Sequence, residues 1–181
     1  MPEASPSSGP RAARARPVGR DEIDLVRRAQ LGSTLAFEQL VLARGPHLHR
    51  FLAVRLRDEA EALDVLQETL TAAWQALPSL KAASKFWPWL CGIALHKAAD
   101  VARRRVPASA HELEPVTDSG SASIEVREAV AALPEKQRQV VLLRYVLELS
   151  EEEVAYALGI RVGTVKSRSA RARAALEELL R

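Results

Sequence analysis

The sequence has little of what a disulfide-stabilised or metal-binding protein needs, because its 181 residues include a single cysteine, Cys91. One cysteine cannot form an intramolecular disulfide, and no Cys/His spacing in the chain resembles a zinc site. We therefore predict that the protein binds no metal and no other cofactor. A chain of this kind fits a reducing compartment, which predicts a cytoplasmic location.

Aromatic residues and long apolar runs are also scarce. Phe, Trp and Tyr make up 4% of the residues, and no apolar run approaches the ~20 residues that a membrane-spanning helix needs. The chain is instead rich in Ala, Leu, Arg and Glu, which favour helices over a sheet of β-branched and aromatic residues. The composition predicts a soluble, all-α protein.

The residues of an enzyme active site are missing as well. His47 and His49 are two residues apart in a helical segment and therefore diverge, and His111 has no matched nucleophile. The chain contains no glycine-rich loop that would cradle a phosphate. We therefore predict no catalytic residues and no small-molecule substrate.

Charge is unevenly distributed along the chain. The net charge of +3 is accounted for by residues 1–20, which contain four arginines and one glutamate. Because this segment is rich in Pro, Ala and Ser, it has little apolar surface to bury and is predicted to be a disordered basic arm. The arm is either a solvated tail or an additional contact with a polyanion such as DNA.

Apolar residues at helical spacing divide the rest of the chain into two parts. Residues 21–106 are predicted to form a domain of four helices, with Ser33 or Thr34 capping the second helix. Residues 107–123 contain two prolines, a glycine and several serines without a helical period, which predicts a flexible linker. Residues 124–181 form the second domain. The predicted fold class is therefore all-α, with two small helical domains.

The second domain contains the pattern of a helix-turn-helix. Ser150 with Glu153 three residues later forms a capping box that starts a short helix, and Gly159 permits the left-handed turn that ends it. The next helix carries basic and hydroxyl side chains where a recognition helix meets duplex DNA, and Lys166 and Arg171 are candidates for base contacts. The other candidates for DNA contact are Arg161, Thr164, Ser167, Arg168 and Arg173.

A polar and acidic stripe follows the third predicted helix, at about residues 59–77. Its members fall at offsets of three, four and seven residues and so share one face. They are Asp64, Gln67, Glu68 and Thr71. The opposite, inward face is predicted to contain Ala62, Leu63, Leu66, Leu70 and Trp74. The stripe is either an ordinary solvated face or a docking surface for a basic protein.

The fourth predicted helix combines aromatic residues at its start with a basic cluster at its end. Phe86 and Trp87, beside Lys81 and Lys85, either stack on unpaired bases or belong to the core. The basic cluster at the other end has the charge to neutralise phosphates. It consists of Arg103, Arg104 and Arg105.

Together these segments resemble the extracytoplasmic-function (ECF) sigma factors, the smallest members of the sigma-seventy family, over about residues 21–181. Residues 64–69 (DVLQET) look like the family's polymerase-binding helix. Residues 89–94 (WLCGIA), followed by Asp100 and the three arginines, look like its promoter-melting helix. Residues 133–168 look like its fourth conserved region, although Arg161 stands where the family often has a serine.

The resemblance implies a set of partners. The first domain would bind the clamp helices of the β′ subunit of core RNA polymerase and capture the non-template strand of the minus-ten promoter element, with His96 at a position near the flipped base. The second domain would bind the duplex minus-thirty-five element and the β flap. Family members are commonly silenced by an anti-sigma factor, often one anchored in the membrane, and we expect such a partner here.

A stand-alone DNA-binding transcriptional regulator is the alternative, because such proteins use the same helix-turn-helix. The stripe from Asp64 to Glu68 and the helix with aromatic and arginine residues favour the sigma factor. A simple repressor would need neither.

Overall fold

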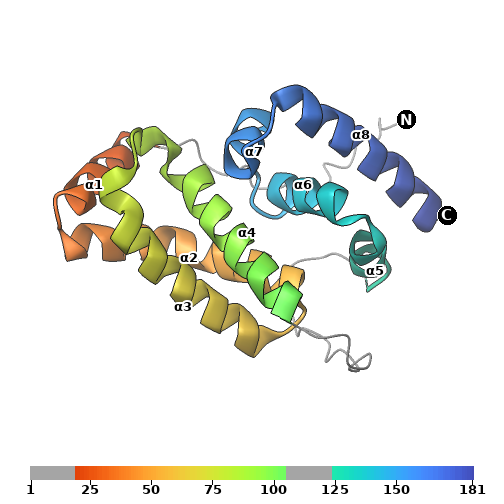
Figure 1. Ribbon diagram of the computed structural model, residues 1–181, viewed down its shortest axis with the longest axis horizontal. Helices are drawn as coiled ribbons and strands as arrows, with labels where there is room; N and C mark the ends of the chain where they lie inside the picture. The colour runs from red at the N-terminus through yellow and green to blue at the C-terminus, as the bar shows by residue number, and fades with distance from the viewer. Residues whose placement is uncertain (1–18, 105–123) are drawn as a thin grey trace, which may run out of the picture.

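The computed structural model describes residues 19–104 and 124–181, and every regular element within these two ranges is a helix (Figure 1). The prediction of an all-α fold is confirmed. The first range contains α1 (Arg20–Gln30), α2 (Thr34–Leu56), α3 (Glu59–Ala76), two short 3-10 turns, η1 (Leu77–Ser79) and η2 (Ala83–Lys85), and α4 (Phe86–Arg104). The second range contains α5 (Ile124–Ala132), α6 (Glu135–Tyr145), α7 (Glu151–Leu158) and α8 (Val162–Leu179). The predictions for the basic arm, for Arg105 and for the linker lie largely or wholly outside the described residues.

Local sequence signals account for the turn between the first two helices. Gly32 follows α1 with φ +93°, a conformation that glycine adopts without a steric penalty. Ser33 then caps α2, because its hydroxyl accepts a hydrogen bond from the backbone N–H of Ala36 at 3.3 Å. The helix continues through Pro46.

The third helix buries a slightly different face from the predicted one. Its fully buried residues are Ala62, Val65, Thr69 and Ala73. Leu63 was predicted to face inward, but 52% of it is exposed, so that prediction is wrong. The reason is geometric, since successive residues of an α-helix are about 100° apart and Ala62 already occupies the inward direction. The polar stripe therefore has an apolar residue at its border.

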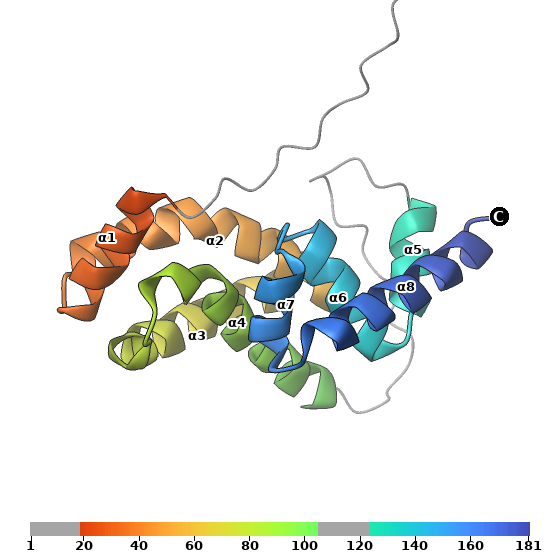
Figure 2. The same cartoon turned by 90° about the horizontal axis from the view of Figure 1, so that it is seen from above.

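The helices form two groups that lie side by side, α1 to α4 and α5 to α8 (Figures 1 and 2). Within the first group α2, α3 and α4 pack on one another, and α1 packs on α2. The two groups meet where α7 lies against α4. One buried apolar cluster runs through this contact, from Val26 of α1 to Val165 of α8. A smaller cluster holds α5, α6 and α8 together through Leu133, Val141 and Ala172.

Candidate functional site

The polar stripe lies on the exposed face of α3. All four of its members are exposed: Asp64, Gln67, Glu68 and Thr71. Lys97 of α4 reaches this face, and its Nζ atom lies 3.2 Å from a carboxylate oxygen of Glu68. Together with Ala72 and Gln75 these residues line an open, shallow groove. The groove presents carboxylate and amide groups, with one lysine at its edge.

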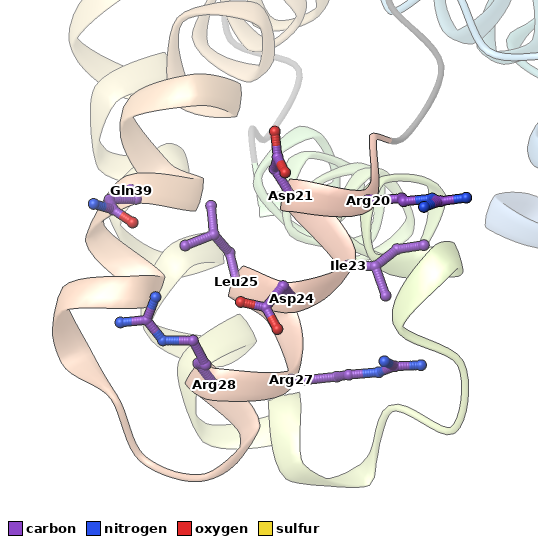
Figure 3. Close-up of a pocket in the computed structure, with 8 residues that line it drawn as sticks. All are labelled: Arg20, Asp21, Ile23, Asp24, Leu25, Arg27, Arg28 and Gln39. Atoms are coloured by element: carbon purple, nitrogen blue, oxygen red, sulfur yellow. The ribbon is translucent and has the colours of Figure 1, made fainter.

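A second shallow depression lies on α1, next to Gln39 of α2, and is lined by Arg20, Asp21, Ile23, Asp24, Leu25, Arg27, Arg28 and Gln39 (Figure 3). Both acidic and basic side chains of α1 line it. Because the charges are mixed in sign, this depression has no single charge that would select a charged ligand.

The aromatic residues at the start of α4 are in the core. Phe86 is 1% exposed and Trp87 is 3% exposed. Neither ring offers a free face for an unpaired base in this conformation, so of the two alternatives that the sequence left open the structure favours the core position. Lys81 is exposed, whereas Lys85 is half-buried with its Nζ atom 5.9 Å from the ring centroid of Tyr156.

A partly buried ion pair places a guanidinium over the ring of Trp87. The Arg44 guanidinium makes two hydrogen bonds to the carboxylate of Glu22, at 2.8 and 2.6 Å, and lies 4.9 Å from the centroid of the Trp87 ring. Sequence reasoning did not identify this group. A usable signal was present, because Arg44 stands midway between Leu40 and Leu48 in an apolar stripe, where a charged residue needs a buried partner.

The loop between α3 and α4 is fastened to α1 by Gln30. The side-chain amide of Gln30 donates hydrogen bonds to the carbonyl oxygens of Leu77 at 3.2 Å and Leu80 at 2.7 Å. This loop carries Lys81 and leads into α4. Gln30 therefore positions a segment that is distant in the sequence. The shorter of its two hydrogen bonds joins residues 50 positions apart.

Replacing Gln30 with leucine is expected to lower the free energy of unfolding by about 1–3 kcal/mol, because buried carbonyl oxygens would lose their donor. Urea denaturation measures the change. Gln39→Leu, at an exposed position of α2, is the matched control and should change stability by less than about 0.5 kcal/mol. Equal effects of the two substitutions would mean that the two hydrogen bonds do not hold the loop.

The last turns of α4 present polar side chains to solvent. His96 and Arg104 are exposed, and Arg103, which is 73% exposed, pairs with the half-buried Asp100 one turn earlier. His96, Asp100 and Arg103 recur at intervals of four and three residues and so share one face of the helix. Arg105 lies outside the described residues.

The helix-turn-helix has the predicted geometry. The Ser150 hydroxyl accepts a hydrogen bond from the Glu153 backbone N–H at 3.1 Å, and the Glu153 carboxylate accepts one from the Ser150 N–H at 2.8 Å. This capping box starts α7. Gly159 ends α7 with φ +62°. The capping box and the glycine turn are both confirmed.

Basic side chains line the exposed side of α8. The exposed candidates are Arg161, Lys166, Ser167, Arg171 and Arg173, and the half-buried ones are Thr164 and Arg168. The Nζ atom of Lys166 lies 3.8 Å from the carboxylate of Glu151 in α7. The Ser167 hydroxyl donates to the Thr164 carbonyl at 3.1 Å. All seven candidates therefore belong to one helix and its cap.

The N-cap of α8 is Arg161, whose side chain makes no capping hydrogen bond. Arg161→Ser is expected to raise the free energy of unfolding by about 1 kcal/mol, because serine can accept a hydrogen bond from a free N–H of the first turn. Thermal or urea unfolding measures the gain. Arg161→Ala should bring no such gain, and a gain of equal size from alanine would refute the capping explanation.

Comparison with known proteins identifies the family. Models for sigma-70 region 2 and sigma-70 region 4 match residues 40–106 and 123–176. The RNA polymerase sigma-H factor of Pseudomonas aeruginosa is 33% identical over 180 residues, which cover 86% of this chain and 92% of that protein. The ECF RNA polymerase sigma-E factor of Escherichia coli (strain K12) is 36% identical over 174 residues, which cover 84% and 91%. The chain belongs to the ECF sigma factors of the sigma-70 family.

Solved structures agree with this assignment. The structure of CnrH in complex with the cytosolic domain of CnrY matches with a TM-score of 0.74 and 32% identity over 88% of this chain and 97% of that chain. The sigma factor RpoE in complex with the anti-sigma factor NepR, from Bartonella quintana, matches with a TM-score of 0.68 and 28% identity over 80% and 96%. Both neighbours have the same helical architecture.

The two family matches fall on the two groups of helices. The match to region 2 spans most of α2 and all of α3 and α4, and the match to region 4 spans α5 to α7 and most of α8. As an ECF sigma factor, the protein binds core RNA polymerase and promoter DNA and directs transcription initiation. Sigma factors are generally not enzymes. Within the described ranges, no helix is long and apolar enough to span a membrane.

Proposed function

We propose that three exposed helix faces divide the work of promoter recognition in this sigma factor. The face of α3 binds the clamp helices of the polymerase β′ subunit, the loop before α4 and the end of α4 hold the minus-ten strand, and α8 reads the minus-thirty-five element with the β flap beside it. One observation carries this assignment. Each face is exposed and chemically suited to its partner, and the faces follow one another in the order typical of the family.

The α3 face suits a basic protein surface. Asp64 and Glu68 supply two carboxylates one turn apart. The polar side chain of Gln67 lies between them along the helix, and that of Thr71 follows Glu68. Charged groups of one sign raise the rate of association with an oppositely charged patch and disfavour partners of the same sign. In the free protein Lys97 forms an ion pair with Glu68. Because this pair is exposed, breaking it so that Glu68 can bind the polymerase would cost little free energy.

The α4 surface suits single-stranded DNA through its charges. We assign phosphate contacts to Lys81, Arg103 and Arg104, and a position beside the flipped base to His96 and Asp100. Because Phe86 and Trp87 are buried, we propose that they hold the start of α4 in place and do not stack on bases. Lys85 reaches DNA only after it leaves Tyr156.

The α8 surface suits the major groove of duplex DNA. We assign base contacts to Lys166 and Arg171 with Ser167 beside them, because a recognition helix enters the groove with its N-terminal half. The phosphate contacts are assigned to Arg161, Thr164, Arg168 and Arg173. Each phosphate contact adds to the salt dependence of binding, whereas a base contact changes the preferred sequence.

Run-off transcription with purified core polymerase and a pool of genomic promoter fragments, with and without the protein, tests these assignments. Transcripts that depend on the protein and start at discrete sites are the expected result, and they would reveal both promoter elements. Absence of such transcripts, together with sequence-specific binding of duplex DNA by the protein alone, would favour the stand-alone regulator instead.

We also propose that an anti-sigma factor controls the protein. Support comes from the neighbour RpoE, which was solved in complex with the anti-sigma factor NepR. We further propose that the protein acts in the cytoplasm, held at the membrane where its anti-sigma factor is anchored there, that it has no catalytic activity of its own, and that its two domains span residues 21–106 and 124–181.

A further inference from the structure

An ion pair links the recognition helix α8 to the helix before it, α7. The Nζ atom of Lys166 lies 3.8 Å from a carboxylate oxygen of Glu151, which is in the first turn of α7. The side chain of Lys166 is 66% exposed, whereas that of Glu151 is 31% exposed. The lysine therefore faces solvent with its charged end beside a carboxylate from the neighbouring helix.

No charged side chain lies one turn away from Lys166 on its own helix. The residues three and four positions away on α8 are all uncharged: Val162, Gly163, Ser169 and Ala170. Among the described residues, nothing beyond the adjacent helix backbone lies within 4 Å of a Cβ atom added to Gly163, so the space on that side is open. Pairing within α8 thus cannot restrain the lysine, and Glu151 supplies a restraint from α7.

The start of α7 fixes the position of Glu151. This residue directly follows the capping residue Ser150, whose reciprocal hydrogen bonds with Glu153 hold the first turn of the helix. Helix α7 also packs on α8, and Val154 and Val165 from the two helices are fully buried in the same apolar cluster. Close packing of this kind resists shifts of one helix past the other. A rigid turn therefore presents the carboxylate to Lys166.

A lysine on a recognition helix can make two kinds of contact with duplex DNA. Its ammonium is a compact charge with three hydrogen-bond donors on a flexible four-carbon stem. Donation to phosphate oxygens carries no sequence information. Donation to the O6 and N7 atoms of guanine in the major groove reads the sequence. The direction of the stem therefore decides which contact the lysine makes.

We infer that Glu151 is a positioning residue for sequence readout by α8. Its carboxylate engages one donor of Lys166 and holds the stem on the α7 side, which leaves two donors for a guanine of the minus-thirty-five element. Without Glu151 the lysine swings to the phosphate backbone. Glu151 acts in this way only if Lys166 contacts a base, so its role rests on the proposed function.

The ion pair has the strength of a tuning contact. At about 0.15 M salt the Debye length is roughly 8 Å, about twice the 3.8 Å between the two groups, so the pair persists under physiological conditions. An exposed pair changes an equilibrium by up to about fivefold. Glu151 should therefore strengthen the preference of Lys166 for guanine without being its source.

Glu151→Gln removes the carboxylate charge and keeps the size of the side chain. Glutamine is also a good helix former, so α7 should stay intact. We expect the preference for guanine at one base pair to fall by about two- to fivefold. Because Lys166 then neutralises a phosphate, the plot of log affinity against log salt concentration should steepen by up to about 0.9.

Selection from a pool of random duplex DNA, by the full-length protein bound to core RNA polymerase, tests this role. Sequencing of the bound DNA at several salt concentrations gives both the base preferences and the salt dependence. Lys166→Met identifies the base pair that Lys166 reads, since it should abolish a preference for guanine at that position. A preference for another base there would overturn the assignment to guanine.

Glu152→Gln is the matched control, because it removes the same charge at an exposed position of the same turn. It should leave the preference for guanine unchanged. The double variant of Glu151→Gln with Lys166→Met should have the same base preferences as Lys166→Met alone. An effect of Glu151→Gln that persists without Lys166 would mean that the carboxylate acts through the general charge and does not position the lysine.

The two single variants separate this role from the proposed function. A preference for guanine that is lost in Lys166→Met but undiminished in Glu151→Gln would overturn the positioning role and leave the proposed function standing. Unchanged preferences in Lys166→Met would refute the base contact of Lys166 under the proposed function, and the positioning role would fall with it.

Discussion

Reversing two charges with the double substitution Asp64→Lys and Glu68→Lys is expected to abolish binding to core RNA polymerase. Both side chains are exposed on α3, in the groove that we assign to the polymerase clamp. Like charges placed opposite each other across an interface cost several kcal/mol, and every 1.4 kcal/mol corresponds to about tenfold in affinity. We expect the affinity to fall by at least about 100-fold, measured by fluorescence anisotropy of the labelled protein.

The fold should survive this reversal, because neither residue is in the core. The double substitution Glu177→Lys and Glu178→Lys is the matched control, since it makes the same change in net charge at exposed positions of α8. The control should retain polymerase binding. Unchanged binding by the Asp64 and Glu68 variant would show that α3 is not the polymerase surface and would strengthen the case for a stand-alone regulator.

Replacing Trp87 with alanine is expected to lower the free energy of unfolding by about 3–5 kcal/mol, the range typical of large aromatic residues in cores. The indole is 3% exposed and lies under the Arg44 guanidinium. Such a loss is a large share of the 5–15 kcal/mol that usually separates folded from unfolded proteins. Urea denaturation with circular dichroism measures it.

Trp89→Ala is the control for this prediction, because Trp89 is only partly buried and should contribute less. If Trp87 served mainly to stack on a base, Trp87→Ala would leave stability nearly unchanged and lower promoter opening instead. Permanganate reactivity of thymines in the minus-ten region would detect that second outcome. A core role and a base-stacking role for Trp87 therefore give opposite pairs of results.

Local signals in the chain predicted the parts of the structure that depend on neighbouring residues. Ser150 and Glu153 are three residues apart, and their reciprocal hydrogen bonds need nothing beyond one helical turn. Gly159 ends α7 for an equally local reason, since only its own φ decides the turn. The polar face of α3 followed from helical spacing, but the exposure of Leu63 did not, because periodicity does not give the exact direction of the core.

Two features depended on segments that meet only in the folded protein. The sequence left the role of Trp87 open, and its place in the core depends on Arg44 of α2, which lies over the Trp87 ring and pairs with Glu22 of α1. The shorter hydrogen bond of Gln30 joins residues 50 positions apart, and no local pattern predicts such a partner. Both features depend on which helix faces become neighbours, and many different pairings satisfy the same hydrophobic period.

The sequence by itself determined the helices, their caps, the family and the chemical character of the three exposed faces, because each of these follows from residues within a few turns of one another. Only the tertiary structure decided that α7 lies on α4. That contact depends on the close approach of Gly92 to Ala157, 65 positions later in the printed sequence. A glycine in a helix reveals no partner until another backbone fills the space where its side chain would be.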